Sequence, residues 1–180
     1  MKPITCCDPN NNKNNGREPL VRTERLLIRL ASEAEMRELI EQEPEEALKQ
    51  AYTEMLDACI AHPEQRQWYA AWLIELPDGQ RVGDLCFKGL SPDGAVEIGY
   101  GLLPAYWGKG YASEAVSAMT EWASRQPGVR RIEAETDPDN AASQRVLQKA
   151  GFVPTETCGE EGPRFVRCAA PQAESGELLC

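Results

Sequence analysis

The spacing of hydrophobic positions changes several times between Leu20 and Cys168, which indicates a chain that alternates strands and helices. Apolar residues recur at helical spacing in four segments, which are residues 33–43, 45–61, 113–124 and 141–150. Short apolar or alternating runs, typical of strands, occupy residues 26–30, 68–76, 81–90, 96–103, 130–136, 152–158 and 164–168. Gly, Pro, Asp and Asn punctuate these runs, so the pattern predicts turns between the elements.

The order of these elements predicts one mixed sheet. Short turns join the strands of residues 68–103, which favours an antiparallel meander. Strand, helix and strand then alternate twice in the second half of the chain. We therefore expect an α/β fold, more narrowly an α+β mixed sheet, that is mostly antiparallel and has helices on both faces.

The last strand of the meander has an unusual face. Glu97 shares it with Gly99 and Gly101, while the opposite face is formed by Val96, Ile98, Tyr100 and Leu102. Glycine inside a strand suggests a bulge or a close neighbour. A bulge here would splay two strands and admit a ligand between them.

The length of 180 residues suits one domain with loose ends. Five Asn occupy positions 10 to 15, and such a segment cannot bury a core, so we expect residues 1–19 to be a disordered tail. Residues 170–180 show no period and are expected to be a loose C-terminal tail. The domain is thus predicted to span residues 20–169.

Composition narrows the classes of partner. A formal net charge of −10 repels phosphate backbones, so we expect no nucleic-acid partner. The seven cysteines show no C-x-x-C spacing, and we expect no metal site. No apolar stretch approaches the length of about 20 residues that spans a bilayer, and the first 20 residues lack the pattern of a secretory signal. A cytoplasmic protein without a membrane partner is the expectation.

Residues 103–115, with the sequence LPAYWGKGYASEA, carry the strongest chemical signal. Pro104 ends a strand, Gly108 and Gly110 permit unusual backbone angles, and a helix opens directly afterwards. Free backbone N–H groups at a helix N-terminus bind phosphate groups, and Lys109 could add a positive charge. The alternative at this level is an ordinary glycine-rich turn between strand and helix.

A nucleotide-binding oxidoreductase is a second interpretation of the same segment. Residues 108–113 approach the G-x-G-x-x-G pattern of dinucleotide sites, but Ser113 stands where the third glycine belongs. The preceding strands also form hairpins, whereas dinucleotide sites follow crossover units. No P-loop pattern occurs, and His62 is the only histidine, which disfavours a Ser/His or Cys/His triad.

Three segments together resemble the GNAT N-acetyltransferase superfamily. They are the glycine-rich segment, residues 140–152 (NAASQRVLQKAGF) and residues 21–29 (VRTERLLIR). Within the superfamily they are similar to the branch of the ribosomal-protein N-terminal (alanine/serine) acetyltransferases. The resemblance spans roughly residues 20–168. It implies the GNAT acyl-CoA N-acyltransferase fold, acetyl-CoA as cosubstrate, a peptide N-terminus or small-molecule amine as acceptor, and a homodimer.

The resemblance also implies where acetyl-CoA lies. Its diphosphate would bind the backbone N–H groups of Gly108, Lys109, Gly110, Tyr111, Ala112 and Ser113. Its pantetheine would lie between the strands of residues 96–103 and 130–136, and Asn140 would bond the pantetheine amides, cap its own helix, or do both. A backbone N–H near Leu102 or Leu103 would stabilise the oxyanion. Acceptor pockets of this fold correspond to residues 32–66 and 155–163, which show no readable specificity.

In this family the acceptor amine attacks the thioester directly. Because an α-amino group has a pKa of about 8 and a lysine of about 10.4, the acceptor must lose a proton first. Glu97 is the candidate base, directly or through water; the alternative is a solvated glutamate. Many members protonate the leaving thiolate with a Tyr where this chain has Leu147, so Ser143 is the candidate donor, or else a serine of the helix surface. The missing Tyr leaves a non-catalytic acyl-CoA-binding protein as an alternative.

Overall fold

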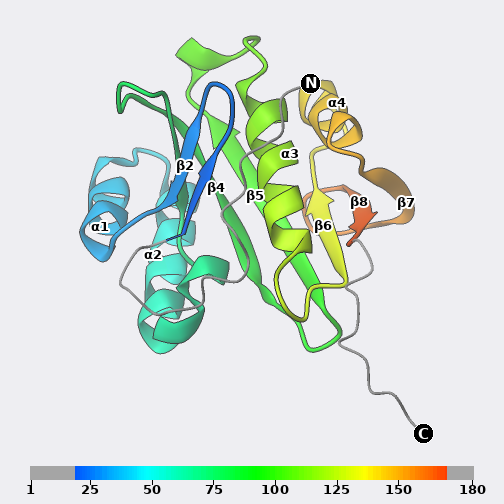
Figure 1. Cartoon of the computed structure of the whole chain (residues 1–180), viewed down its shortest axis with the longest axis horizontal. Helices are drawn as coiled ribbons and strands as arrows, with labels where there is room; N and C mark the ends of the chain where they lie inside the picture. The colour runs from blue at the N-terminus through cyan, green and yellow to red at the C-terminus, as the bar shows by residue number, and fades with distance from the viewer. Residues whose placement is uncertain (1–18, 170–180) are drawn as a thin grey trace, which may run out of the picture.

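From β1 to β6, strands that follow one another along the chain also lie side by side in the computed structural model, which describes residues 19–169 (Figure 1). The tails predicted for residues 1–19 and 170–180 lie outside this range, apart from Pro19. The strands are β1 (Leu20–Arg22), β2 (Leu27–Leu30), β3 (Trp72–Glu75), β4 (Arg81–Leu90), β5 (Ala95–Leu102), β6 (Arg131–Glu135), β7 (Val153–Cys158) and β8 (Pro163–Cys168). The helices are α1 (Glu33–Gln42), α2 (Glu46–Ala61), α3 (Tyr111–Ser124) and α4 (Ala141–Lys149), with 3-10 turns η1 (Pro63–Trp68) and η2 (Pro104–Tyr106).

The sheet is mixed and mostly antiparallel, as predicted. Its order over the described residues is β1-β2-β3-β4-β5-β6-β8-β7, and β5 with β6 is the parallel pair. The insertion of β8 between β6 and β7 was not predicted. Strand order depends on how the β7–β8 hairpin folds back against β6, and no local pattern encodes that choice.

Helices cover both faces of the sheet. Alternate residues of β3 point to opposite sides, so Trp72 and Ile74 join the core under α3 and α4, whereas Leu73 joins a smaller core under α1 and α2. On the side of α1 and α2, the outward positions of β5 and β6 hold glycines and charged residues instead of apolar ones. These residues are Glu97, Gly99, Gly101, Arg131, Glu133 and Glu135.

Local capping explains where two of the helices begin. Ser32 caps α1, since its hydroxyl accepts from the N–H of Glu35 and the Glu35 carboxylate accepts from the N–H of Ser32 at 2.8 Å. Asn140 caps α4, because its Oδ1 accepts from the N–H of Ser143 at 3.0 Å. Gly151, with φ of +84°, follows the end of α4. The cap at Asn140 was one of the roles expected from the sequence.

Two predicted boundaries were wrong. The strand expected from residue 68 begins only at Trp72, because Trp68 belongs to η1 and packs against Phe87 and Trp122. An alternating run of large apolar residues therefore included a buried 3-10 turn. Helix α3 begins at Tyr111, two residues earlier than predicted, because Gly110 is its N-cap residue.

The bulge expected on the glycine-lined strand lies on its neighbour. Gly99 and Gly101 pair regularly with Cys86 and Asp84 of β4. The register shifts between Phe87 and Leu90, where Gly89 adopts a φ of +85°. A left-handed residue is what such a bulge requires, and on these two strands Gly89 supplies it.

Candidate active site

Strands β5 and β6 diverge along their length. They pair only at their first residues, from Ala95 opposite Arg131 to Glu97 opposite Glu133. Beyond Glu97, β5 keeps β4 as its neighbour on one side, while the later residues of β6 pair with β8. The sheet therefore opens between β5 and β6 toward the end of β5 at Leu102.

Beyond the end of β5, the glycine-rich loop forms an N-terminus of α3 that no side chain caps. Gly108 and Gly110 have φ of +74° and +82°, and Gly110 is the N-cap residue. A Cβ on Gly108 would meet nothing within 4 Å, so backbone angle and not space requires glycine there. The first N–H groups of α3, together with the positive end of the helix dipole, fit a diphosphate.

The hairpin of β1 and β2 is clamped to this loop. The Glu114 carboxylate, in the first turn of α3, accepts hydrogen bonds from the Thr23 hydroxyl at 2.6 Å and from Arg25 Nε at 2.7 Å. Arg25 also donates to the carbonyl of Lys109 at 3.0 Å and lies 4.8 Å above the ring of Tyr111. Although burial opposes it, hydrogen bonds from Thr23 and Arg25 hold the pKa of Glu114 below its usual value. Sequence reasoning missed this clamp.

Side chains of the loop are ordered by aromatic contacts. The Lys109 ammonium lies 5.0 Å from the ring centre of Tyr106. Trp107 is 65% exposed, and its indole N–H donates to the carbonyl of Leu102 at 2.7 Å. This bond ties the loop to the last residue of β5.

The end of β5 offers one backbone donor toward the opening. The N–H of Leu103 donates to the carbonyl of Val82 at 2.9 Å, on the β4 side. Because backbone groups of successive residues in a strand point to opposite sides, the N–H of Leu102 points toward the opening. Of the two predicted oxyanion donors, Leu102 has the suitable direction.

Ser143 meets a residue that sequence reasoning did not select. Its hydroxyl lies 2.8 Å from the hydroxyl of Tyr100, which also bonds the carbonyl of Ser143 at 3.2 Å. Burial raises the pKa of Tyr100, so this phenol stays protonated at neutral pH. Leu147, at the position of the usual family Tyr, is fully buried in the core. Tyr100 thus brings a phenol to Ser143 from β5 and not from α4.

Glu97 lies where β5 and β6 begin to diverge, in an ion pair with Lys88. The Lys88 ammonium is also 3.2 Å from Glu161, and although burial opposes it, the bonds to both carboxylates raise the pKa of Lys88. Along the strand, Glu97 is five residues from Leu102, which corresponds to about 17 Å. Its carboxylate is therefore remote from the Leu102 N–H.

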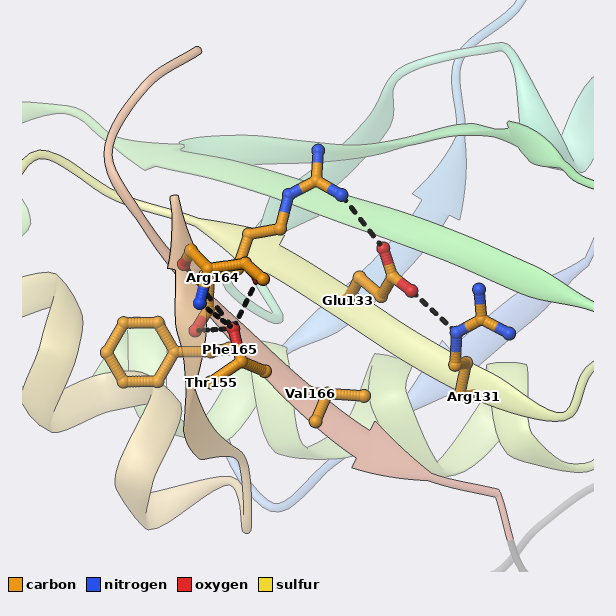
Figure 2. A pocket seen from close by; sticks show the side chains of 7 residues that line it. Arg131, Glu133, Thr155, Arg164, Phe165 and Val166 are labelled. Atoms are coloured by element: carbon orange, nitrogen blue, oxygen red, sulfur yellow. Dashed lines mark hydrogen bonds and ion pairs between the residues drawn. The ribbon is translucent and has the colours of Figure 1, made fainter. Parts of the chain in front are cut away.

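A pocket lies over β6, β7 and β8, and Figure 2 shows Glu133 between two arginines at this site. Glu133 accepts from Arg131 Nε at 2.6 Å and lies 3.7 Å from Arg164. Thr155 donates to the carbonyl of Arg164 at 3.2 Å. Since Glu97 and Glu133 are partners in register, this charged pocket continues the face that carries Glu97.

Residues 19–169 contain neither a cluster of metal-ligating side chains nor a helix that could span a membrane. No group of three or more His, Cys, Asp or Glu side chains there is placed to hold a metal ion. None of the helices in that range is long and apolar enough to cross a membrane.

Comparison with known proteins assigns the family. A family model described as "Acetyltransferase (GNAT) domain" matches residues 18–153. This chain belongs to the GNAT acetyltransferase family. The Uncharacterized N-acetyltransferase YoaA of Bacillus subtilis is 33% identical over 109 residues, which cover 59% of this chain and 60% of that protein. The match thus spans about three fifths of this curated relative.

Solved GNAT structures confirm the expected fold. The ribosomal L7/L12 alpha-N-protein acetyltransferase RimL, solved in complex with coenzyme A, superposes with a TM-score of 0.67 at 19% identity, over 83% of this chain and 98% of that one. A spermidine N-acetyltransferase from Vibrio cholerae, solved with CoA and spermine, gives a TM-score of 0.65 at 14% identity, over 82% of this chain and 97% of that one. At these identities the likeness concerns the fold.

Proposed function

We propose that this GNAT protein transfers the acetyl group of acetyl-CoA to a primary amine by direct attack in a ternary complex. The observation that carries the proposal is the opening between β5 and β6, which ends beside the uncapped N-terminus of α3. A thioester on a long flexible arm with a diphosphate at its other end fits such a slot. Membership of the GNAT family supports the same reaction.

The chain offers a partner for each part of acetyl-CoA. The diphosphate binds the backbone N–H groups from Gly108 to Ser113, and the pantetheine lies between β5 and β6. Asn140 already caps α4 with its Oδ1, so any contact with the pantetheine would come from its amide nitrogen. The Leu102 N–H stabilises the negative charge that develops on the carbonyl oxygen as the amine attacks.

Ser143 and Tyr100 are proposed to protonate the leaving thiolate. Their hydroxyls lie 2.8 Å apart and either can donate to the other, so Tyr100 is placed to replace a proton that Ser143 gives. This arrangement would supply the role that the missing Tyr plays elsewhere in the family, and it argues against a protein that binds acyl-CoA without turnover.

The acceptor enters from the face that carries α1 and α2. A peptide N-terminus is favoured by the branch resemblance and by the fold shared with RimL, and a small amine such as a polyamine is the second candidate. The net charge of −10 attracts either cation. The free cysteines among the described residues, and the bacterial origin of relatives such as YoaA, support a cytoplasmic setting. The homodimer implied by the branch stays a prediction.

Thermal denaturation with and without ligand tests the cosubstrate. At 100 times its dissociation constant, acetyl-CoA should add about 2.7 kcal/mol, which corresponds to about 5–10 °C for a chain of this size. NAD(H) at the same excess should give no shift. A shift with NAD(H) alone, or with neither, would overturn the proposal.

Turnover separates an enzyme from a protein that only binds acyl-CoA. We expect free coenzyme A thiol to appear faster when a peptide with an N-terminal Ser or Ala, or spermidine, is added with acetyl-CoA. Binding of acetyl-CoA without thiol release for any of these amines would favour the non-catalytic alternative.

A further inference from the structure

A second carboxylate lies on the glycine-lined face, much nearer to the end of β5 than Glu97. Asp84 of β4 is the register partner of Gly101, the residue before Leu102. Partners of this kind have Cα atoms about 5.5 Å apart. The side chain of Asp84 is on the side of the sheet that carries α2, since it bonds Tyr52. It therefore lies beside the proposed oxyanion donor.

The space next to Asp84 is open. Gly101 is exposed, and a Cβ built on it would meet nothing within 4 Å. The backbone angle does not require a glycine at this strand position, because its φ is not positive. Crowding does not require one either, because a side chain would have free space. The missing side chain leaves room above Gly101 for an acceptor amine that approaches the Leu102 N–H.

One hydrogen bond partner orients the Asp84 carboxylate. The hydroxyl of Tyr52 lies 3.0 Å from each of its two oxygens, and Tyr52 is only 6% exposed. Burial, with help from the Asp84 charge, raises the pKa of Tyr52, so the phenol keeps its proton and is the donor. A single O–H cannot saturate two carboxylate oxygens, so Asp84 keeps lone pairs for a second donor.

The charges around Asp84 come from three elements. Burial raises its pKa, hydrogen bonding from Tyr52 of α2 and the positive charge of Arg81 lower it, and the negative charge of Glu43 at the end of α1 raises it. Together these effects raise the pKa of Asp84. On β4 the neighbouring thiol of Cys86 has a pKa that burial raises to about 11, and it is thus uncharged near neutral pH. The facing positions of β5 are Gly99 and Gly101.

We propose that Asp84 is the catalytic base that takes the proton of the acceptor ammonium. The assignment rests on the proposed acetyl transfer. The ammonium gives one proton to the Asp84 carboxylate, and the freed lone pair forms the C–N bond at the thioester carbonyl. The C–S bond breaks with its electron pair on sulfur, and the thiolate takes a proton from Ser143. The second proton leaves the nitrogen as the amide forms and passes through water to the Ser143–Tyr100 pair, which restores the proton that this pair gave. Asp84 then returns its proton to water.

Asp84→Asn provides the principal test, with Asp93→Asn in the exposed turn before β5 as matched control. Asparagine can still accept from Tyr52, and it removes a carboxylate that burial disfavours, so the variant should unfold at no lower temperature than the wild type near neutral pH. The thermal shift with acetyl-CoA should be unchanged. Acetylation of a peptide with an N-terminal Ala should fall by about a hundredfold at pH 7, whereas Asp93→Asn should retain full activity.

The pH profile distinguishes a base from a structural residue. Without Asp84, only amine already neutral in solution can react, so kcat/KM of Asp84→Asn should rise about tenfold per pH unit up to the amine pKa of about 8 and recover above it. Hydroxylamine, which is uncharged at neutral pH, should be a far less affected acceptor. Tyr52→Phe removes a bond that lowers the Asp84 pKa, so the acid limb of its profile should move to higher pH.

The outcomes separate this assignment from the proposed function. An active wild type with an Asp84→Asn variant that keeps its rate and pH profile would overturn the role of Asp84. The role of Asp84 would also be overturned if the acetylation rate recovered at high pH in Glu97→Gln and not in Asp84→Asn, because Glu97 would then be the base. A wild type that neither binds acetyl-CoA nor acetylates any amine would overturn the proposed function, and the role of Asp84 with it.

Discussion

The position of Gly110 makes two requirements that glycine meets better than any other residue type. Its φ of +82° strains any side chain by about 1–2 kcal/mol, and its N–H lies at the proposed diphosphate site. We expect Gly110→Glu to raise the dissociation constant of acetyl-CoA at least about tenfold, because a carboxylate would face the diphosphate. Thermal shift or calorimetric titration would measure it.

Gly79 provides the matched control for this substitution. It lies in the turn between β3 and β4 with a φ of +85°, and a Cβ there would meet nothing within 4 Å. Gly79→Glu adds the same charge and nearly the same backbone strain, so both variants should lose similar stability. Equal affinity for acetyl-CoA in the two variants would contradict the placement of the diphosphate at α3.

At the residue scale, local chemistry was predictable and distant pairing was not. Ser32 and Asn140 cap helices within three residues of themselves, and the glycines of the loop act through their own backbone angles. Tyr100 and Asp84, in contrast, have proposed roles that depend on hydrogen-bond partners 43 and 32 residues away along the chain. No spacing in the sequence predicts such pairs, because they come together only when the strands of the sheet and the packed helices take their places.

Among the elements, the clamp between the β1–β2 hairpin and α3 has measurable consequences. Glu114→Gln should cost about 1–3 kcal/mol, since it removes the negative charge and one of the two acceptor oxygens that Thr23 and Arg25 bond. It should also weaken acetyl-CoA binding, because Arg25 supports the loop at Lys109. Glu121→Gln on the same helix breaks ion pairs with Arg125 and with Arg167 of β8, and it should cost less than about 1 kcal/mol and leave binding unchanged.

The pH dependence of this clamp has a definite sign. The folded protein holds the pKa of Glu114 below the ordinary value of 4.5, so the stabilisation is present above that pH and is lost as the pH falls. The difference in unfolding free energy between wild type and Glu114→Gln should therefore shrink below about pH 4.5. A difference that stays constant into acid would mean that the charge of Glu114 contributes nothing.

The order of the helices and strands was more predictable than the residues at which they begin and end. Periodicity found the four helices and most strands because each buries one continuous face, as α3 does with Ala115, Val116 and Met119. It failed at Trp68, where a 3-10 turn buries a large ring as a strand would. It also misplaced the bulge, since the sequence shows which residues are glycines but not which of them, Gly89 or Gly99, adopts a positive φ.

For the molecule as a whole, the residues that form the two cores lie between Leu26 and Phe165. The clamp, the loop, the β5–β6 opening and Ser143 fall within residues 23–143, which also lie inside the described part of the chain. A chain of residues 19–169 should therefore fold independently, unfold within about 2 °C of the full chain, and show the same shift with acetyl-CoA. A lower unfolding temperature with an unchanged ligand shift would give the tails a stabilising role, whereas loss of the ligand shift alone would place part of the acetyl-CoA site outside the proposed domain.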